Sequence, residues 1–275
     1  LRKAGRAPSC PRSSSRTAPD LMSIIDEYRY FLKDSIRKKI DFRTTDQHRG
    51  LPTPPFEKKP PPESEIFDLP SPVDWRGEIK DPGLLRAIGR RRSRRKYTDC
   101  PLSLSELGFL LWATQGVKEV IPGSATLRTV PSAGARHAFE TYLAVFRIEG
   151  LEPGLYRYLP LENQLVSLAR PADMREELVT AALLQSFVGR GAVTFLWTAL
   201  PYRMEWRYSL AAHRVILIDS GHLCQNLYLA CEAIGAGCCA VGAYDQDLVD
   251  AFLGVDGKDE FCVYLAPVGK IDHTG

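Results

Sequence analysis

The pattern of polar and apolar residues changes along the chain, and it distinguishes the segments expected to form strands from those expected to form helices. Three stretches are rich in β-branched and aromatic residues and predict strands: 141–148, 192–200 and 261–268. Residues 154–158 and 164–168 have the same character, and Pro160 and Asn163 between them favour a turn. These two segments therefore predict a β-hairpin.

Capping residues mark where several helices are expected to begin and end. Ser103 and Glu106 have the spacing of a capping box ahead of residues 107–115, and Gly116 ends that pattern. The sequence therefore predicts a short helix that begins at a capping box and ends at a glycine.

Two further helices have the same kind of signal. Asp173 followed by Glu176 predicts a helix over 174–186. Asp245 predicts the start of another short helix, which Gly254 closes.

An early helix and a long late one complete the pattern. Asp81 followed by proline predicts a helix from residue 82 to Arg90, because proline is favoured at the first helical position. The longest helix is expected over 214–234, ended by Gly235. It is apolar around most of its circumference, so we expect it to be buried at the centre of the fold or across a subunit interface.

The order of these elements does not alternate strictly between strand and helix. That order favours an α+β fold with a mixed sheet over a doubly wound nucleotide-binding fold. No GxGxxG follows an expected strand and no Walker loop is present. The sequence therefore gives no support to a Rossmann or P-loop nucleotide site.

A proline-rich segment precedes this region. Eight prolines fall between residues 51 and 72, which disfavours regular hydrogen-bonded structure and favours an extended arm. Its apolar anchors are Phe56, Ile66, Phe67 and Trp75. We therefore expect residues 22–80 to form an arm that wraps over its own domain or a partner subunit, and residues 81–275 to form the main domain.

Composition narrows the class of protein. The chain has 275 residues, of which 44% are hydrophobic and 25% charged, as in ordinary globular domains. Its net charge of +3 comes from residues 1–21, which hold five basic residues and one acid. Since Met22 opens a more protein-like stretch, we interpret residues 1–21 as a disordered tail or a start-site artefact, with a transit peptide as the alternative.

The remaining residues give no global charge argument for a nucleic-acid or membrane partner. No apolar run approaches the roughly 18 residues that a membrane-spanning helix needs. Seven cysteines without paired CxxC motifs make zinc and disulfide frameworks improbable, so we expect a reducing, cytoplasmic location. His137, His213 and His222 have no carboxylate at ligand spacing, and we expect no metal.

Three segments could carry chemistry. The run Arg90–Lys96 suits a phosphate, because guanidinium groups and a hydroxyl donate to its oxygens. Taken alone, such a run is more often a solvated face or a nucleic-acid contact. Residues 129–135 form a small-residue turn, and residues 235–244 form a glycine-spaced strand. Both let the backbone approach a planar ligand, although each alone is an ordinary connection.

Together, in this order and spacing, the three segments resemble the nitroreductase family of FMN-dependent oxidoreductases, and most of all its SagB-type dehydrogenase branch, which includes azoline oxidases. Supporting stretches are GLYRY at 154–158, DSGHLCQNL at 219–227 and YLAPVGK at 264–270. The resemblance covers residues 84–270 well. It implies a nitroreductase-like fold with a central, mostly antiparallel sheet flanked by helices.

The resemblance also implies a homodimer with two FMN sites, each built from both chains. By motif position, the residues that match the grip on the FMN phosphate and ribitol are Arg92, Ser93 and Arg95, joined by Lys270. Those that match the turn against the flavin ring are Pro131, Ser132, Ala133 and Gly134. Those that match the backbone facing the hydride-exchanging atom of the flavin are Gly242 and Ala243.

One departure concerns catalysis. Azoline oxidases of this branch have a Lys-Tyr pair where this chain has Arg207 and Tyr208. Arginine stays protonated, so a lysine-type base is lacking, and azoline oxidation with it loses support. Tyr208 is the candidate acid or base, and a half-buried structural tyrosine is the alternative.

The expected activity is two-electron hydride transfer, with NADH, NADPH or the substrate itself as the electron partner. The expected substrate is a nitroaromatic, a quinone or a heterocycle in a modified peptide. Two alternatives remain open at this point. One is a nucleic-acid-binding module that uses residues 90–96, and the other is a flavin-bound scaffold without turnover.

Overall fold

A seven-stranded sheet organises the described residues, 21–75 and 77–272 of the computed structural model. In pairing order its strands are β1 (Ile66–Asp68), β6 (Gln164–Ala169), β5 (Gly154–Leu159), β4 (Phe139–Val145), β7 (Val193–Ala199), β9 (Phe261–Lys270) and β8 (Ala236–Cys238). All six strand pairs are antiparallel. A separate hairpin pairs β2 (Val117–Ile121) with β3 (Ala125–Arg128).

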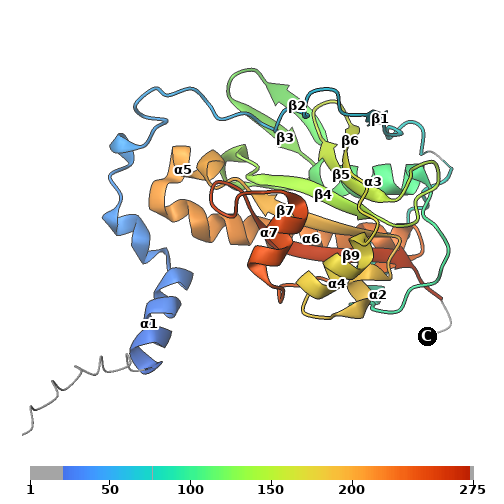
Figure 1. Ribbon diagram of the computed structural model, residues 1–275. Helices are drawn as coiled ribbons and strands as arrows, with labels where there is room; N and C mark the ends of the chain where they lie inside the picture. The colour runs from blue at the N-terminus through green and yellow to red at the C-terminus, as the bar shows by residue number, and fades with distance from the viewer. Residues whose placement is uncertain (1–20, 76, 273–275) are drawn as a thin grey trace, which may run out of the picture. The chain divides into compact units, whose positions relative to one another are not determined.

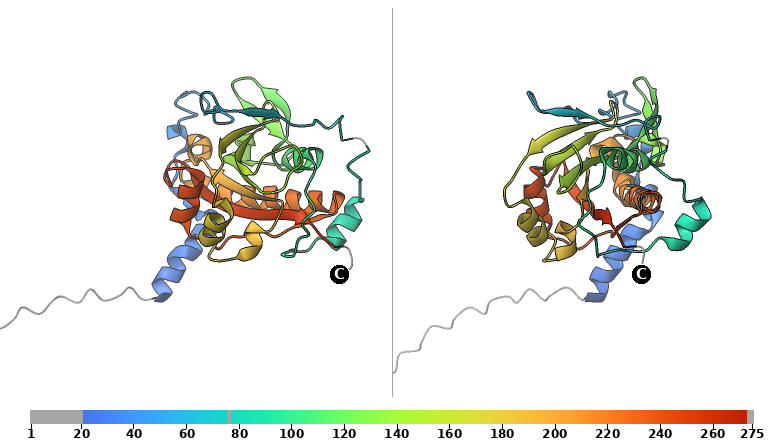
Figure 2. Two further views of the ribbon diagram at one scale, coloured as in Figure 1. Left: turned by 45° about the vertical axis from the view of Figure 1, so that its right-hand side comes forward. Right: turned by 90° about the vertical axis from the view of Figure 1, so that its right-hand side faces the viewer.

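Helices cover both faces of this sheet (Figures 1 and 2). The α3 (Leu104–Gln115) and α6 (Ala212–Ala233) helices pack on one face, and the α4 (Met174–Ala181) and α7 (Gln246–Leu253) helices pack on the other. Side chains along β4 alternate between the two resulting cores, as the period of a strand requires. The predicted α+β architecture with a mostly antiparallel sheet is confirmed.

The chain divides into two compact units between Lys39 and Ile40. The first contains α1 (Leu21–Leu32) and the 3₁₀ helix Asp34–Lys39. All other described elements belong to the second, including residues 40–75 and 77–80 of the predicted arm. The predicted tail, except for Leu21, lies outside the described residues.

Several helix ends follow their predicted caps. The Ser103 side chain accepts the N–H of Glu106, and the Glu106 carboxylate accepts the N–H of Ser103, so the capping box of α3 is complete. The Asp245 carboxylate likewise accepts the N–H of Leu248 at the start of α7. Gly254, with φ of 68°, ends that helix. These short-range predictions are confirmed.

Three predicted boundaries are wrong. The α4 helix ends at Ala181 instead of residue 186, because Leu183 and Leu184 adopt left-handed backbone angles. The α2 helix runs from Leu84 to Arg90, since the Asp81 carboxylate accepts the N–H of Gly83 and so forms a turn before the helix.

The third concerns the glycine-spaced strand. It pairs as β8 only over Ala236–Cys238, and the residues that follow are irregular apart from a bridge between Val241 and Leu265.

The proline-rich arm lies along the second unit's own sheet. Its β1 strand pairs with the edge strand β6, so the arm is not wholly without regular structure. Upstream of β1, Arg128 donates to the carbonyl of Phe56 over 2.8 Å. Arg157 donates to the carbonyls of Lys58 and Lys59 over 2.9 and 2.8 Å. Buried arginines therefore hold the segment 56–59, here called the strap, against the sheet.

Candidate active site

The basic run lies beside strand β8. Ser93 forms a parallel bridge with Cys238, and the N–H of Arg94 donates to the carbonyl of Cys238 over 2.8 Å. Arg91 lies over the ring of Tyr228, at 5.2 Å from its centroid. The side chain of Arg94 packs against Gly237, where an added Cβ would lie 2.6 Å from Arg94 Cγ. Two of the seven side chains of this run, those of Arg91 and Arg94, are therefore partly buried against the rest of the protein.

Arg90, Arg92 and Arg95 are exposed, and of these Arg90 lies 3.8 Å from Glu232. Arg92 and Arg95 make no hydrogen bond or ion pair within the described part of the chain, although Arg95 lies 5.6 Å from the ring centroid of Phe187. A cavity of about 370 Å³ opens between Ser93, Arg95 and Asp272. Two cations thus remain available at the surface beside the Ser93 hydroxyl, and guanidinium donors of this kind suit an anion.

Tyr228 of α6 joins the basic run to the glycine-rich segment. Its hydroxyl lies 2.9 Å from the Ser93 hydroxyl and accepts the N–H of Ala240 over 2.8 Å. Two of the three segments that the sequence singled out, far apart along the chain, therefore lie side by side.

Gly242 and Ala243 follow directly and are exposed. The carbonyl of Ala243 accepts a hydrogen bond from the Gln185 side chain over 2.7 Å. Among the residues that the structure describes, no acceptor is found for the N–H of Gly242 or of Ala243. These two adjacent donors can bind acceptor atoms of a ligand.

The turn at 131–134 is held by α6. The Ala133 N–H donates to Asp219 Oδ2 over 3.2 Å, and the Ser132 hydroxyl accepts the N–H of His137 over 3.0 Å. Burial raises the pKa of Asp219, although its hydrogen bonds with Ser132 and Ala133 favour the ionised form. Pro131 and Gly134, on either side, are exposed.

Tyr208 lies against this turn. Gly134 has a φ of 58°, and a Cβ added there would lie 2.4 Å from the Tyr208 hydroxyl oxygen and 3.0 Å from Arg207 Nε. The backbone angle favours glycine here, and any larger residue would have to displace the ends of Tyr208 and Arg207. Within the described residues the Tyr208 hydroxyl has no hydrogen-bond partner, so it can exchange a proton with a ligand.

Lys270 has other partners. Its ammonium group donates to the Glu106 carboxylate and, over 2.7 Å, to the carbonyl of Ile234 at the end of α6. Glu106 is also the capping residue of α3, so Lys270 links the start of one helix to the end of another. The structure does not bring this ammonium group together with Arg92 and Arg95.

The basic run and the turn are connected through α6. Tyr228 and Asp219 are nine residues apart on this helix, which corresponds to about 13 Å along its axis. Neither residue was singled out from the sequence, because a polar residue in an apolar helix carries no signal of what it contacts. The stretch DSGHLCQNL, which begins at Asp219, contained the available hint.

Two of the three histidines, His137 and His213, have hydrogen-bond partners in the described chain. Burial, with Arg128 nearby, lowers the pKa of His137 to about 3, and its Nε2 lies 3.1 Å from the carbonyl of Thr126. His213 pairs with Glu205 over 2.8 Å. In the described ranges, no cluster of three or more His, Cys, Asp or Glu residues could hold a metal ion. None of the helices there has the length and apolar character to cross a membrane.

Comparisons with known proteins agree with this architecture. Residues 88–270 match the nitroreductase family. "Putative nitroreductase MJ1384" of Methanocaldococcus jannaschii is 32% identical over 193 residues, which cover 70% of this chain and 93% of that protein. The trifolitoxin-processing protein TfxB of Rhizobium leguminosarum bv. trifolii is 27% identical over 154 residues, 54% of this chain.

A crystal structure described as a putative nitroreductase from Anabaena variabilis superposes with a TM-score of 0.62 at 26% identity and covers 77% of this chain. The aligned residues span 41% of TfxB and 42% of the Anabaena chain, so both of these proteins are much longer than the shared region. The fold, the matched region and these relatives indicate that the chain is an oxidoreductase. The chain belongs to the nitroreductase family.

Proposed function

We propose that this protein is an FMN-dependent oxidoreductase that transfers hydride between a nicotinamide or an organic substrate and the flavin. FMN would supply the redox chemistry, while the chain binds and orients it. The observation that carries the proposal is the contact of Tyr228 with both Ser93 and the N–H of Ala240. This contact places the cationic surface, which can bind a phosphate, beside the segment whose backbone N–H groups can bind the flavin ring.

The available donors fit such a cofactor. Arg92, Ser93 and Arg95 would bind its phosphate, and each charge-assisted hydrogen bond contributes about 1.5–3 kcal/mol. The N–H groups of Gly242 and Ala243, free of partners among the described residues, would bind acceptor atoms of the ring. Pro131, Ser132, Ala133 and Gly134 would form a second wall. Lys270, already paired with Glu106, would support the site through α3.

The functional unit that we propose is a homodimer in which each FMN site is completed by the partner. Helix α6 supports this proposal, because it exposes Leu217 and Ile218 at 48% and 44% of their surfaces, beside Leu210 at 52%. Large exposed aliphatic residues, two on α6 and one in the turn before it, are suited to a protein interface. In that case α6, which the sequence predicts to be buried at the centre or across a subunit interface, would lie across the interface between the two subunits.

Tyr208 is the proposed proton donor or acceptor. Its hydroxyl lies beside Gly134 and has no partner among the described residues, whereas Arg207 next to it cannot act as a base. We further propose a peptide-derived heterocycle as the substrate. The resemblance to a protein named for trifolitoxin processing supports a peptide substrate, whereas Arg207 in place of the lysine of azoline oxidases disfavours an azoline as its reacting ring.

The decisive experiment is an anaerobic absorption spectrum of the purified protein before and after addition of NADH or NADPH. We expect flavin bands that bleach on reduction and return in air. A colourless protein that refuses added FMN would contradict the cofactor. A yellow protein that neither nicotinamide reduces, and that oxidises no peptide heterocycle, would favour a flavin-bound scaffold without turnover.

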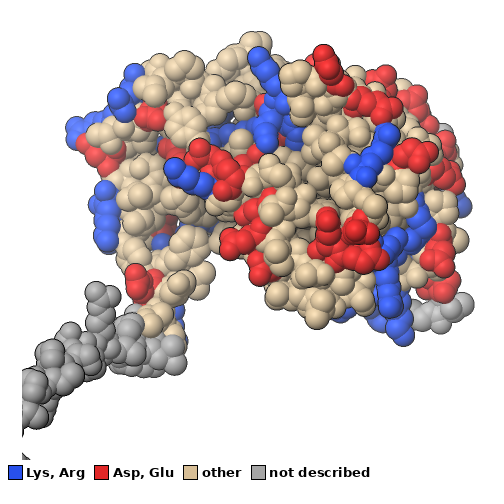
Figure 3. Space-filling model, viewed as in Figure 1, with Lys and Arg blue, Asp and Glu red and all other residues tan. Residues whose placement is uncertain are grey.

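The nucleic-acid alternative has less support. Arg91 and Arg94 of the basic run are partly buried against Tyr228 and Gly237, and Arg90 lies 3.8 Å from Glu232. Figure 3 shows Lys and Arg interspersed with Asp and Glu over the face of the second unit that it presents, without a continuous basic stripe. Salt-sensitive binding of a duplex or single strand would be the contrary result.

A further inference from the structure

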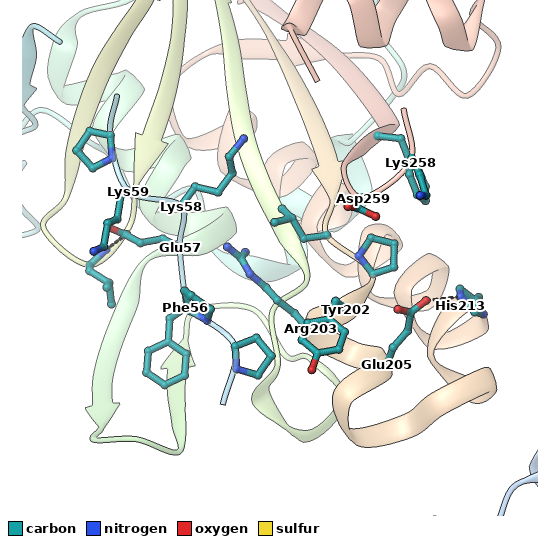
Figure 4. Close-up of a pocket in the computed structure, with 17 residues that line it drawn as sticks. Phe56, Glu57, Lys58, Lys59, Tyr202, Arg203, Glu205, His213, Lys258 and Asp259 are labelled. Atoms are coloured by element: carbon teal, nitrogen blue, oxygen red, sulfur yellow. Dashed lines mark hydrogen bonds and ion pairs between the residues drawn. The ribbon is translucent and has the colours of Figure 1, made fainter. Parts of the chain in front are cut away.

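One cavity of the second unit lies apart from the residues assigned to the cofactor. It measures about 1210 Å³ and lies between the strap and helix α5 (Tyr202–Tyr208). Figure 4 shows the strap on one side and Glu205 of α5 on the other, with Lys258 and Asp259 at the rim. Charged groups of both signs surround this cavity, so its chemistry favours no single class of ligand.

The turn that follows helix α4, in contrast, contacts the glycine-rich segment directly. The Gln185 side chain donates to the carbonyl of Ala243 over 2.7 Å, and the N–H of Asp245 donates to the carbonyl of Ala181 over 2.8 Å. Two hydrogen bonds therefore join the end of α4 to the segment that carries the N–H groups of Gly242 and Ala243.

The hydrogen bonds of Gln185 define the orientation of its amide group. The Nε2 atom donates to the carbonyl of Ala182 over 2.9 Å as well as to that of Ala243. Since both partners are carbonyl oxygens, the nitrogen of the amide must face them, and both of its hydrogens are used. The side chain therefore bridges two backbone carbonyls that belong to different parts of the fold.

This bridge is the main restraint on the backbone that carries the two free donors. Residues 242–244 lie between Val241, which pairs with β9, and Asp245, which donates to α4. Among the described residues, Gln185 alone forms a hydrogen bond with the backbone of residues 242–244. By holding the carbonyl of Ala243, it restricts the two dihedral angles of that residue and hence the direction of its N–H.

Gln185 reaches this position through a strained turn. Leu183 and Leu184 have φ of 54° and 61°, in the left-handed region that leucine rarely adopts. Their side chains are 55% and 76% exposed, so their own burial does not account for this backbone. The turn does place the Gln185 amide between its two carbonyls. Strain of this kind persists where the surrounding contacts hold it, and it is concentrated at functional sites.

The same segment also contacts the cationic surface. Phe187, two residues after Gln185, has its ring centroid 5.6 Å from the guanidinium carbon of Arg95. The next residue, Val188, is buried, and its carbonyl accepts the hydroxyl of Thr194 on β7 over 2.6 Å. A segment anchored on the sheet therefore contacts both a cation proposed for the phosphate and the backbone proposed for the ring.

We propose that Gln185 is a positioning residue for the flavin ring. By holding the carbonyl of Ala243, it directs the N–H groups of Gly242 and Ala243 toward acceptor atoms of the ring. This inference rests on the proposed function, because it requires a flavin at this surface. Gln185 has no contact with the phosphate in this arrangement, so its contribution to binding is the same with or without a phosphate on the ligand.

Riboflavin and FMN distinguish the ring from the phosphate, because riboflavin is FMN without the phosphate. The full-length apoprotein is titrated with each ligand, and quenching of flavin fluorescence gives the affinity. Gln185→Leu removes both donors and should weaken the two flavins by the same factor, about threefold or more. Gln185→Glu keeps the shape of the side chain but turns a carboxylate toward two carbonyl oxygens, and should weaken both flavins further. Arg95→Ala should weaken FMN alone.

The absorption bands of bound FMN give a second readout that depends on the ring. They should shift in both Gln185 variants, because the donors to the ring are no longer held, and should stay unchanged in Arg95→Ala. The thermal unfolding midpoint of each apoprotein, measured without flavin, should remain close to that of the wild type.

Two control variants are matched to these changes. Gln164→Leu removes an amide that donates to Asp68 over 2.8 Å between β6 and β1, away from the glycine-rich segment. Leu184→Gly removes an exposed side chain beside Gln185 and keeps the turn, since glycine adopts positive φ readily. Both controls should bind riboflavin and FMN as the wild type does.

Wild-type affinity for both flavins, with unshifted FMN bands, in folded Gln185→Leu and Gln185→Glu would overturn the proposal and leave the cofactor intact. Weaker binding of FMN alone would also overturn it, because Gln185 would then act on the phosphate. The same weakening in Leu184→Gly would assign the effect to the leucine side chain. Unfolding of the apoprotein in both Gln185 variants would show a purely structural role.

The wild-type titration separates this inference from the proposed function. Wild-type protein that binds FMN, with Gln185 variants that behave like it, refutes only the role of Gln185. Wild-type protein that binds neither flavin refutes the proposed function, and the role of Gln185 with it.

Discussion

At the scale of single residues, equal charges have different roles because their neighbours differ. Arg95 and Lys270 were both matched to an anion site by motif position. Arg95 is exposed and makes no hydrogen bond or ion pair among the described residues, whereas the Lys270 ammonium group is bound to Glu106 and to the carbonyl of Ile234. A cation that already has two acceptors contributes less to a new ligand, since those bonds must be exchanged.

Arg95→Ala should weaken FMN binding about tenfold or more, because one charge-assisted contact to the phosphate is lost. The measurement is a fluorescence titration of apoprotein with FMN. Lys118→Ala, an exposed cation on β2 that does not line this cavity, is the control and should leave the affinity unchanged. The rise in thermal stability produced by FMN, about 2.7 kcal/mol at 100 times its dissociation constant, should shrink in parallel. An unchanged titration would remove Arg95 from the site.

Asp219→Asn should change the pH dependence of stability. Burial raises the pKa of Asp219 in the folded protein, so ionisation opposes folding. The wild type therefore loses stability as the pH rises through that raised pKa, whereas the asparagine variant has no such loss. Urea unfolding between about pH 4 and pH 7 should show the variant gaining relative to the wild type as the pH increases.

The control for that measurement is Asp256→Asn. The N–H groups of Glu260 and Lys258 lower the pKa of Asp256, so its contribution is present at neutral pH and is lost as the pH falls. Its asparagine variant should show the opposite trend. The same trend in both variants would contradict the assignment to Asp219.

At the scale of elements, the strap is held by buried charge instead of strand pairing. Burial alone would raise the pKa of Glu140, but Arg203 and Arg157 outweigh it and lower that pKa overall. Since Arg203 belongs to α5 and Arg157 to β5, Glu140 connects the arm to the helix that carries Tyr208. The arm is therefore part of the framework of the site.

Arg157→Ala should destabilise the protein by about 3–5 kcal/mol, because it leaves the buried Glu140 carboxylate with one partner fewer and two strap carbonyls without their donor. Arg170→Ala is the matched control, since Arg170 forms an exposed pair with Glu65 and should cost about 0–1 kcal/mol. Urea unfolding monitored by tryptophan fluorescence measures both. Similar losses in the two variants would mean that the buried pair does not secure the strap.

At the scale of the whole molecule, the proposed dimer depends on the exposed face of α6. The double substitution L217E/I218E should convert the protein to a monomer, because two charges per chain would enter an apolar contact. Size-exclusion chromatography with light scattering gives the mass, and FMN content should fall with it because the site would be shared. Leu248→Glu, on α7 and 46% exposed, is the control. A wild-type monomer that binds FMN would contradict the shared site.

Local signals predicted much of the fold. The capping box at Ser103 and Glu106 and the closure of α7 by Gly254 are short-range patterns, and both are confirmed. The end of α4 was missed, because the backbone angles of Leu183 and Leu184 depend on their tertiary surroundings and not on their own propensities.

What the sequence by itself determined was five strands of the main sheet, β4, β5, β6, β7 and β9, the capped starts of α3 and α7, and the family to which the chain belongs. Each of these rests on residues close together in the chain or on motif order. Tertiary structure alone decided that Tyr228 joins Ser93 to Ala240, that Glu106 binds Lys270, and that buried arginines hold the strap. Such contacts join residues many positions apart. Their side chains acquire partners only when packing removes them from water, and no local pattern records which partner that will be.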